Sequence, residues 1–103
     1  MPPVLEDGIQ FATRNVERLK EPEDYQVILL NDDYTTMDFV VAILMRIFHK
    51  DEAEANRIML DVHQDGRGRA GSYSWDIAIT KREQVHSLAR EHEFPLRCGV
   101  EPC

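Results

Sequence analysis

Three side chains that accept hydrogen bonds, Asn31, Asp32 and Asp33, stand together where an apolar stretch of the sequence ends. Asn31 offers an amide oxygen and Asp32 a carboxylate, and neutral His63 offers one ring nitrogen. Such a set suits a compact cation with three N–H donors, because a buried donor without a partner costs about 1–3 kcal/mol, and more when charged. The first hypothesis is therefore a binding site for an amino group, formed by Asn31, Asp32 and His63.

These residues also have ordinary structural interpretations. Asn and Asp hydrogen-bond their own backbone in turns, so this tripeptide alone is more typical of a turn. A single histidine such as His63 on an apolar helix face more often makes structural hydrogen bonds. Asp32, Asp33 and His63 could also ligate a metal or form an acid–base pair, but no HExxH motif, Ser/His/Asp order or activated cysteine supports this. We therefore expect no enzyme activity, no metal site and no cofactor.

Apolar residues on the faces of the two predicted helices flank these polar groups. Met37, Val40, Met59 and Val62 fit a plain hydrophobic core, which is the more common interpretation. They also fit the wall of a pocket, since methionine is flexible and polarizable and adapts to several large side chains. The sequence leaves both interpretations open.

The composition predicts one soluble globular domain. The 103 residues are 43% hydrophobic and 30% charged, which is ordinary for such a domain. The net charge of -7 argues against nucleic acid or an anionic membrane as the main partner. The first residues lack the pattern of a signal peptide, and no apolar run has membrane-spanning length. Cys98 and Cys103 are too few for a disulfide framework, so we expect a reducing cytosol.

The first half of the domain predicts one strand and two helices. The apolar run over 25–30 predicts a buried strand. Thr35 is the expected N-cap of the next helix, with Asp38 completing a variant capping box, and helical spacing predicts this helix over 36–49. Asp51 begins a second helix, whose last turns carry the candidate histidine.

The second half predicts a strand, a helix and a strand. A turn over 65–68 ends the second helix. Apolar and polar residues then alternate over 70–79, which predicts a strand with one wet face. A capping box at Thr80 begins a third helix, Pro95 ends it, and 96–100 form a short last strand.

The predicted order of elements is strand, helix, helix, strand, helix, strand. A three-stranded antiparallel sheet with three helices on one face is an α+β sandwich of two layers. Residues 1–23 are polar and punctuated by proline, so we expect a mobile N-terminal extension before a folded domain of residues 24–103.

Several of these motifs together resemble the signature of the ClpS adaptors. That signature has a strand followed by Asn-Asp-Asp-Tyr-Thr, a variable position, Met, an acidic residue and Phe-Val, and it matches residues 25–40. The resemblance continues through residues 59–63, the Gly66 turn and residues 93–96. It covers nearly the whole of 25–100, and the motifs agree in order, so it is specific where each part alone is weak.

The resemblance implies an adaptor rather than an enzyme. ClpS adaptors bind the free α-amino group and bulky hydrophobic first residue (Leu, Phe, Tyr or Trp) of N-degron substrates, and deliver them to the AAA+ unfoldase ClpA or ClpC of the Clp protease. It implies that Asn31, Asp32 and His63 bind the α-amino group and that Met37 is a gatekeeper against β-branched side chains. The implied pocket wall is Leu30, Thr35, Met37, Val40, Met59, Val62 and Leu96.

The resemblance also bears on the unfoldase. Residues 1–23 would correspond to the extension that engages it, and Asp76 and Lys81 match positions on the docking face. The family further implies a monomer in the bacterial cytoplasm. The sequence departs from the family pattern at four positions: Thr36 stands where proline is common, Arg69 replaces an apolar strand residue, Asp76 replaces a glutamate, and Ile79 stands where an acidic residue is usual. They concern the unfoldase more than the bound residue.

Two other classes remain as alternatives. A general protein-interaction domain of the same fold predicts that Asn31 and His63 point apart or into hydrogen bonds of their own. A small metal-dependent hydrolase predicts an ion near Asp32. A cavity that opens between Met37 and Met59, with the acceptors at its edge, favours the adaptor.

Overall fold

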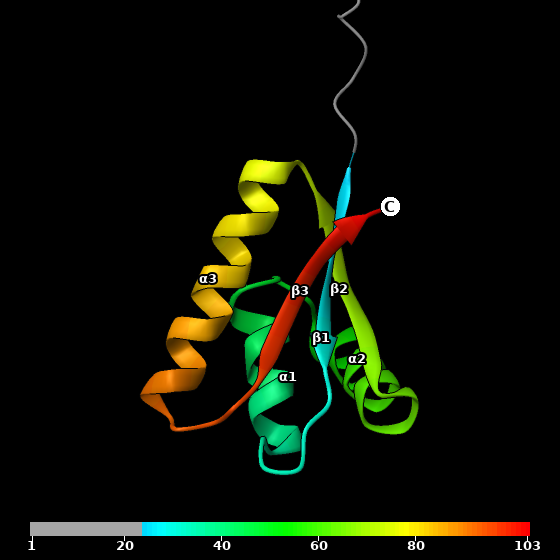
Figure 1. Cartoon of the computed structure of the whole chain (residues 1–103). Helices are drawn as coiled ribbons and strands as arrows, with labels where there is room; N and C mark the ends of the chain where they lie inside the picture. Colours follow the sequence, from blue (N-terminus) through cyan, green and yellow to red (C-terminus); the bar gives the residue numbers. More distant parts are fainter. Residues whose placement is uncertain (1–23) are drawn as a thin grey trace, which may run out of the picture.

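Three strands and three helices follow one another in the order predicted from the sequence (Figure 1). The structure is a computed structural model that describes residues 24–103, and the predicted N-terminal extension of residues 1–23 lies outside the described residues. The elements are β1 (Tyr25–Leu30), α1 (Met37–Arg46), α2 (Glu52–Asp65), β2 (Arg67–Tyr73), α3 (Trp75–Glu91) and β3 (Arg97–Pro102).

The sheet has β1 at its centre, with β2 on one side and β3 on the other, and both neighbours run antiparallel to it. Side chains of successive strand residues point to opposite faces. Val27 and Leu29 point toward the helices and are fully buried. Three helices therefore cover one face of a three-stranded sheet, and the predicted two-layer α+β fold is confirmed.

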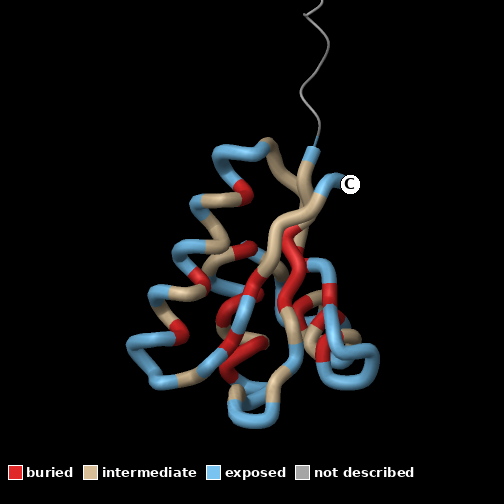
Figure 2. The backbone as a smooth tube through the Cα atoms, viewed as in Figure 1, coloured by how far each residue is buried: buried red, intermediate tan, exposed pale blue. Residues whose placement is uncertain are grey.

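The hydrophobic core lies between that face of the sheet and the helices, where the buried segments gather in Figure 2. Helix α1 contributes Ile43 and Leu44, both fully buried, at the spacing of one apolar helix face. Burying one such side chain stabilises the fold by about 1.5–3 kcal/mol. The core therefore fixes the positions of α1 and of the loop that leads into it.

The start of α1 differs from the prediction. Thr36, not Thr35, is the N-cap: its hydroxyl oxygen accepts a hydrogen bond of 3.1 Å from the backbone N–H of Phe39. The helix ends at Arg46 rather than His49, because His49 has a backbone φ of 58° that no α-helix contains. Thr35 is thereby free for the loop before the helix.

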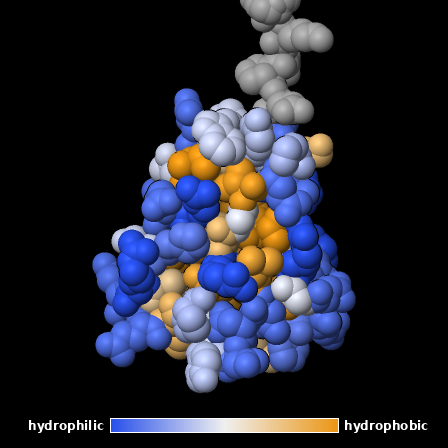
Figure 3. All heavy atoms as spheres, in the orientation of Figure 1, coloured by the Kyte–Doolittle hydropathy of each residue, from blue (hydrophilic) through white to orange (hydrophobic). Residues whose placement is uncertain are grey.

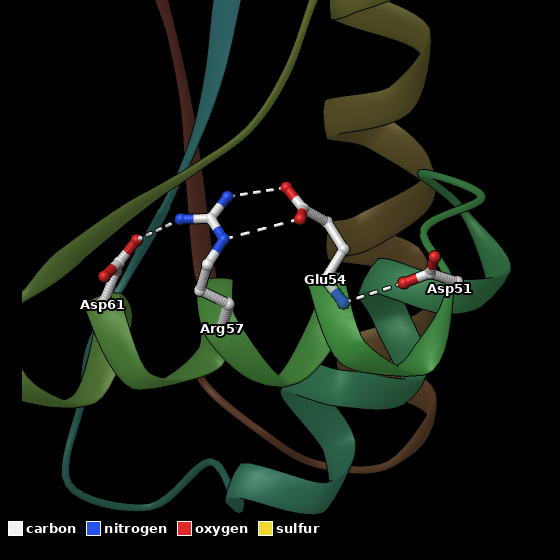
Figure 4. Close-up of polar contacts among 4 residues, drawn as sticks. All are labelled: Asp51, Glu54, Arg57 and Asp61. Carbon is white, nitrogen blue, oxygen red and sulfur yellow. Dashed lines mark hydrogen bonds and ion pairs between the residues drawn. The ribbon is translucent and has the colours of Figure 1, made fainter.

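The caps predicted for α2 are confirmed. Asp51 is the N-cap, and its carboxylate accepts a hydrogen bond of 2.8 Å from the backbone N–H of Glu54 (Figure 4). At the other end Gly66 adopts φ 87°, the left-handed region that glycine enters without steric cost. The turn predicted over residues 65–68 is shorter in the structure, since β2 already begins at Arg67.

The strand predicted over 70–79 is wrong in its second half. β2 ends at Tyr73, Ser74 occupies the N-cap position, and α3 begins at Trp75. Thr80 lies inside this helix, where its hydroxyl donates to the backbone carbonyl of Asp76 at 2.9 Å instead of capping. The alternation misled because Trp75 and Ile77 are 51% and 50% exposed, so they mark no buried strand face.

Apolar side chains thus remain on the surface near the start of α3. Figure 3 shows one side of the molecule, where an apolar area is surrounded by hydrophilic residues. The ring of Trp75 packs edge-on against Tyr25, with the ring centroids 5.0 Å apart. This contact ties the first turn of α3 to the first residue of β1.

The end of α3 and the last strand also shift from the prediction. The helix ends at Glu91, and Glu93 adopts φ 60°, so the helix stops before Pro95. β3 covers 97–102 instead of 96–100. Leu96, left outside the strand, is buried in the core.

His86 on α3 covers the outer edge of β3. Its Nε2 accepts a hydrogen bond of 3.0 Å from the backbone N–H of Cys98, which requires a neutral ring. Burial lowers the pKa of His86 below 6.5, and the nearby charges of Glu83, Arg82 and Arg90 act in smaller and partly opposed ways.

This geometry predicts a pH dependence of stability. Below the unfolded pKa of 6.5 the unfolded chain binds a proton at His86 that the folded chain does not, so stability falls as pH decreases. Urea unfolding at about pH 7 and about pH 5 is expected to show a larger loss for the wild type than for His86→Gln, which does not titrate. Equal losses in the two proteins would contradict this role of His86.

Candidate functional site

A cavity of about 460 Å³ opens at the carboxyl end of β1, between the β1–α1 loop and α2. Its size lies within the range of small-ligand sites. The residues that line it come from the loop, the first turn of α1 and the last turns of α2: Asn31, Asp32, Asp33, Tyr34, Thr35, Thr36, Met37, Val40, Met59, Val62 and His63.

One backbone hydrogen bond explains why the two halves of the cavity meet. The N–H of Asn31 donates to the carbonyl oxygen of Gly66 at 2.9 Å, which fastens the end of β1 to the end of α2. His63 lies less than one helical turn before Gly66 and therefore faces the loop across the cavity. The structure thus brings the acceptors Asn31, Asp32 and His63 to one cavity from two separate elements.

The cavity has an apolar floor and a polar rim. Val40 and Val62 are buried in the core with only a small area open to the cavity, while Met37 at the start of α1 is 43% exposed. Thr35 and Met59, which were also predicted for the pocket wall, line the cavity as well. Such a cavity suits a molecule with an apolar side chain and a polar, positively charged end.

Two residues predicted for the pocket wall do not line this cavity. Leu30 follows Leu29 on β1, so the alternation of a strand turns its side chain to the face away from the core. Leu96 is 4% exposed and belongs to the hydrophobic core. Conversely, Asp33, Tyr34 and Thr36 line the cavity although the sequence did not single them out as wall residues. They all lie in the six-residue connection between β1 and α1, and this closeness to Asn31 and Asp32 in the sequence could have indicated that they line the site.

Asp32 organises the loop that forms the rim. One carboxylate oxygen accepts hydrogen bonds from the backbone N–H groups of Tyr34 at 2.8 Å and Thr35 at 2.7 Å. The other accepts a hydrogen bond of 2.7 Å from the hydroxyl of Thr35. Asp32 therefore does form the turn that the sequence suggested for it. The hydroxyl of Thr35 bonds to Asp32 and does not cap the helix. A carboxylate has about four acceptor positions, so one remains for a ligand.

The charge of Asp32 is retained at the rim. Partial burial acts to raise the pKa of the Asp32 carboxyl, but the hydrogen bonds from Thr35 and Tyr34 and the charge of Arg97 outweigh it. The net pKa of Asp32 lies below its usual value of 3.8. The rim therefore carries a fixed negative charge near neutral pH, which favours a cation.

The two residues matched to the unfoldase-docking face lie five positions apart on α3. Asp76 is exposed in the first turn. The Nζ of Lys81 donates to the carbonyl oxygen of Ile47 at 2.7 Å and lies 5.7 Å from the ring centroid of Phe48 and 5.3 Å from that of Tyr73. Lys81 thus holds the end of α1 as well as presenting a charge near the surface.

Over residues 24–103, no group of three or more His, Cys, Asp and Glu side chains is arranged to hold a metal ion. Within the same range, no helix is long and apolar enough to cross a membrane.

Comparisons with known proteins agree on one family. The family model described as "ATP-dependent Clp protease adaptor protein ClpS" matches residues 20–99. An ATP-dependent Clp protease adapter protein ClpS from Syntrophus aciditrophicus is 60% identical over 85 residues, which are 82% of this chain and 79% of the relative. One from Hydrogenovibrio crunogenus is 50% identical over 99 residues, covering 96% of this chain and 94% of the relative.

A solved structure has the same fold. It is that of ClpS2 from Agrobacterium tumefaciens bound to L-phenylalaninamide, with a TM-score of 0.77 and 37% sequence identity. The match covers 81% of this chain and 100% of that chain.

Proposed function

Because this chain belongs to the ClpS family of Clp protease adaptors, we propose that its cavity binds the first residue of N-degron substrates. The ligand is a free α-amino group with a bulky hydrophobic side chain, Leu, Phe, Tyr or Trp. One observation carries this proposal: acceptors from the end of β1 and from α2 share the rim of a cavity with an apolar floor. The solved ClpS2 supports it, since L-phenylalaninamide has a free α-amino group and an aromatic side chain.

Each lining residue has a proposed role. Asn31, Asp32 and His63 accept hydrogen bonds from the α-ammonium group, and the charge of Asp32 offsets that of the ligand. Burying one Leu or Phe side chain gives about 1.5–3 kcal/mol, and each hydrogen bond to a charged group adds about 1.5–3 kcal/mol. After the loss of translational freedom, an affinity on the order of micromolar follows, which suits an adaptor that must release its substrate. The proposed side-chain wall is Thr35, Met37, Val40, Met59 and Val62.

Delivery is the second part of the proposed function. The adaptor hands its substrate to the AAA+ unfoldase of the Clp protease, ClpA or ClpC, in the bacterial cytoplasm, and acts as a monomer. Asp76 and Lys81 on α3 contact the unfoldase, although the hydrogen bond of Lys81 to Ile47 must persist or be exchanged on docking. Residues 1–23 serve as the extension that engages the unfoldase, and residues 24–103 form the adaptor core.

Titration with short peptides that differ only in their first residue tests the binding step. Fluorescence anisotropy is expected to give affinities on the order of micromolar for Leu, Phe, Tyr or Trp first, and at least about tenfold weaker binding for Ala or Ser first, because the apolar floor is then unfilled. Peptides that bind equally whatever their first residue would instead favour a general protein-interaction domain.

Met37→Ala tests the gatekeeper role. Met37 stands half-exposed at the cavity, so its truncation should widen the site and improve binding of Val-first or Ile-first peptides by about tenfold. Met45→Ala is the matched control, since Met45 lies on the same helix, is similarly exposed and does not line the cavity. If Met37→Ala still rejected Val-first and Ile-first peptides as the wild type does, Met37 would not determine specificity.

A further inference from the structure

The face of the sheet that points away from the helices carries a group of arginines. We call this the open face. Val27 and Leu29 point toward the helices, so the side chains that alternate with them on β1, and the cross-strand neighbours of those side chains, point to the open face. One of them is Arg69, the residue that departs from the apolar strand position of the ClpS pattern. The open face consists of Gln26, Ile28 and Leu30 of β1, Arg67, Arg69 and Ser72 of β2, and Arg97, Gly99 and Glu101 of β3.

Charged side chains cover the apolar centre of the open face. Ile28 is only 4% exposed, although it points away from the helices and the core. Arg67 reaches diagonally across β1 to Glu101, with the guanidinium nitrogen 2.8 Å from the carboxylate oxygen. Arg69 lies directly opposite Ile28 and donates to the hydroxyl of Ser72 at 2.6 Å. The aliphatic stems of arginine shield such a residue while their charged ends stay in water.

The open face is positive on a chain whose net charge is -7. It carries Arg67, Arg69 and Arg97 against the single acid Glu101. Only Arg67 pairs with that acid, and neither Arg69 nor Arg97 forms an ion pair within residues 24–103. Among the described residues, the guanidinium groups of Arg69 and Arg97 therefore have no carboxylate partner, and they can pair with a carboxylate of a bound peptide.

These arginines begin where the cavity ends. Arg67 and Arg97 flank Leu30 on either side, and Leu30 immediately precedes Asn31 at the cavity rim. Arg97 is close enough for its charge to act on the Asp32 carboxylate. Negative charge at the rim thus gives way to positive charge along the open face, a pattern complementary to an ammonium group followed by carboxylates.

We propose that the open face binds the substrate polypeptide just beyond its first residue and favours acidic side chains there. This inference rests on the proposed function. An extended chain advances about 3.3 Å per residue, and Ile28 lies three residues from Asn31, so roughly the third to sixth substrate residues would lie over the arginines. Guanidinium groups bind carboxylates in a two-pronged geometry. There is room for the chain above Gly99, where an added Cβ would meet no atom within 4 Å.

The test compares Phe-first peptides that carry Glu, Gln or Lys at their third to sixth positions. For each protein variant the readout is the ratio of affinities for the Glu and Gln peptides, so any general loss of binding cancels. The wild type is expected to prefer the Glu peptide by about three- to tenfold at low salt, and less as salt screens the charges. Arg69→Gln and Arg97→Gln should each reduce this preference, and the double variant should abolish it.

Arg57→Gln is the matched control. Arg57 sits on the exposed surface of α2, paired with Glu54 and Asp61 (Figure 4), and removing it changes the net charge by the same amount. It should leave the preference for the Glu peptide intact. Equal binding of the three peptides to the wild type, or a preference that survives in the double arginine variant or is lost equally in Arg57→Gln, would overturn the inference alone. Failure of even the Gln peptide to bind would instead overturn the proposed function and this inference with it.

Discussion

Acetylation of the first residue is expected to weaken binding of a Phe-first peptide by about 100-fold or more. The acetyl group turns an ammonium with three donors into an amide with one, and removes its positive charge. Asn31, Asp32 and His63 would then face a group that satisfies at most one of them. The fixed charge of Asp32 would also lose its partner, because the low pKa of this carboxyl keeps it ionised.

Isothermal titration with the free and the acetylated peptide measures this difference. A peptide acetylated on an internal lysine side chain is the control, since it changes the overall charge by the same amount and leaves the α-amino group free. Binding of the acetylated Phe-first peptide within a few-fold of the free one would show that the acceptors at the rim do not recognise the amino group.

Replacement of Asp32 by alanine is expected to impair both the loop and the binding of substrate. The change removes the acceptor for the backbone N–H groups of Tyr34 and Thr35 and for the Thr35 hydroxyl. Donors left without a partner cost about 1–3 kcal/mol when buried, so a loss of stability near the lower end is expected for this partly exposed loop. Loss of the charge and of the ordered rim together should weaken binding of a Phe-first peptide by at least about tenfold.

Two further variants separate the loop from the charge. Asp32→Asn keeps an oxygen for the backbone N–H groups but carries no charge, so it should preserve stability better than binding. Asp33→Ala is the matched control at the same rim, because the carboxylate of Asp33 accepts no hydrogen bond within the described range of residues. If Asp33→Ala lowered stability and peptide binding as much as Asp32→Ala, the hydrogen bonds of Asp32 in the turn would not explain the losses in Asp32→Ala.

Protonation of Asp32 in acid should also lower the stability of the protein. Its folded pKa lies below the ordinary value of 3.8, so its contribution to stability is complete above that value and is lost as pH falls through the folded pKa. The loss should be smaller in Asp32→Asn than in the wild type. Thermal unfolding across this acidic range distinguishes it from the contribution of His86, which is lost at higher pH, below 6.5.

The sequence by itself determined the elements whose signals are local. The apolar run of β1, the cap at Asp51 and the end of α2 at Gly66 are each set by neighbouring residues, and all three stand as predicted. Side-chain type alone also says that Asn31 and Asp32 can accept hydrogen bonds, and their role in binding an amino group stays a prediction. The family pattern then indicated which of these groups belong to one site.

The boundary between β2 and α3 was decided by tertiary structure. Alternating apolar residues predicted a longer strand, but Ala78, Val85 and Ala89 find burial only as a helix face against the sheet. Trp75 and Ile77, which carried the alternation, lie at the surface instead. Periodicity reports which residues are apolar, whereas burial depends on what packs against them.

Only the tertiary structure decided the shape of the site and the character of the open face. Strand register places the side chain of Leu30 on the open face, and Leu96 is buried in the core. The backbone hydrogen bond from Asn31 to Gly66 holds the end of α2, and with it His63, next to the β1–α1 loop. Arg67, Arg69 and Arg97 are far apart along the chain, and the antiparallel pairing of three strands makes them neighbours. Residue types are written in the chain, but contacts between distant segments exist only once the sheet has formed, since each depends on the register of its partner.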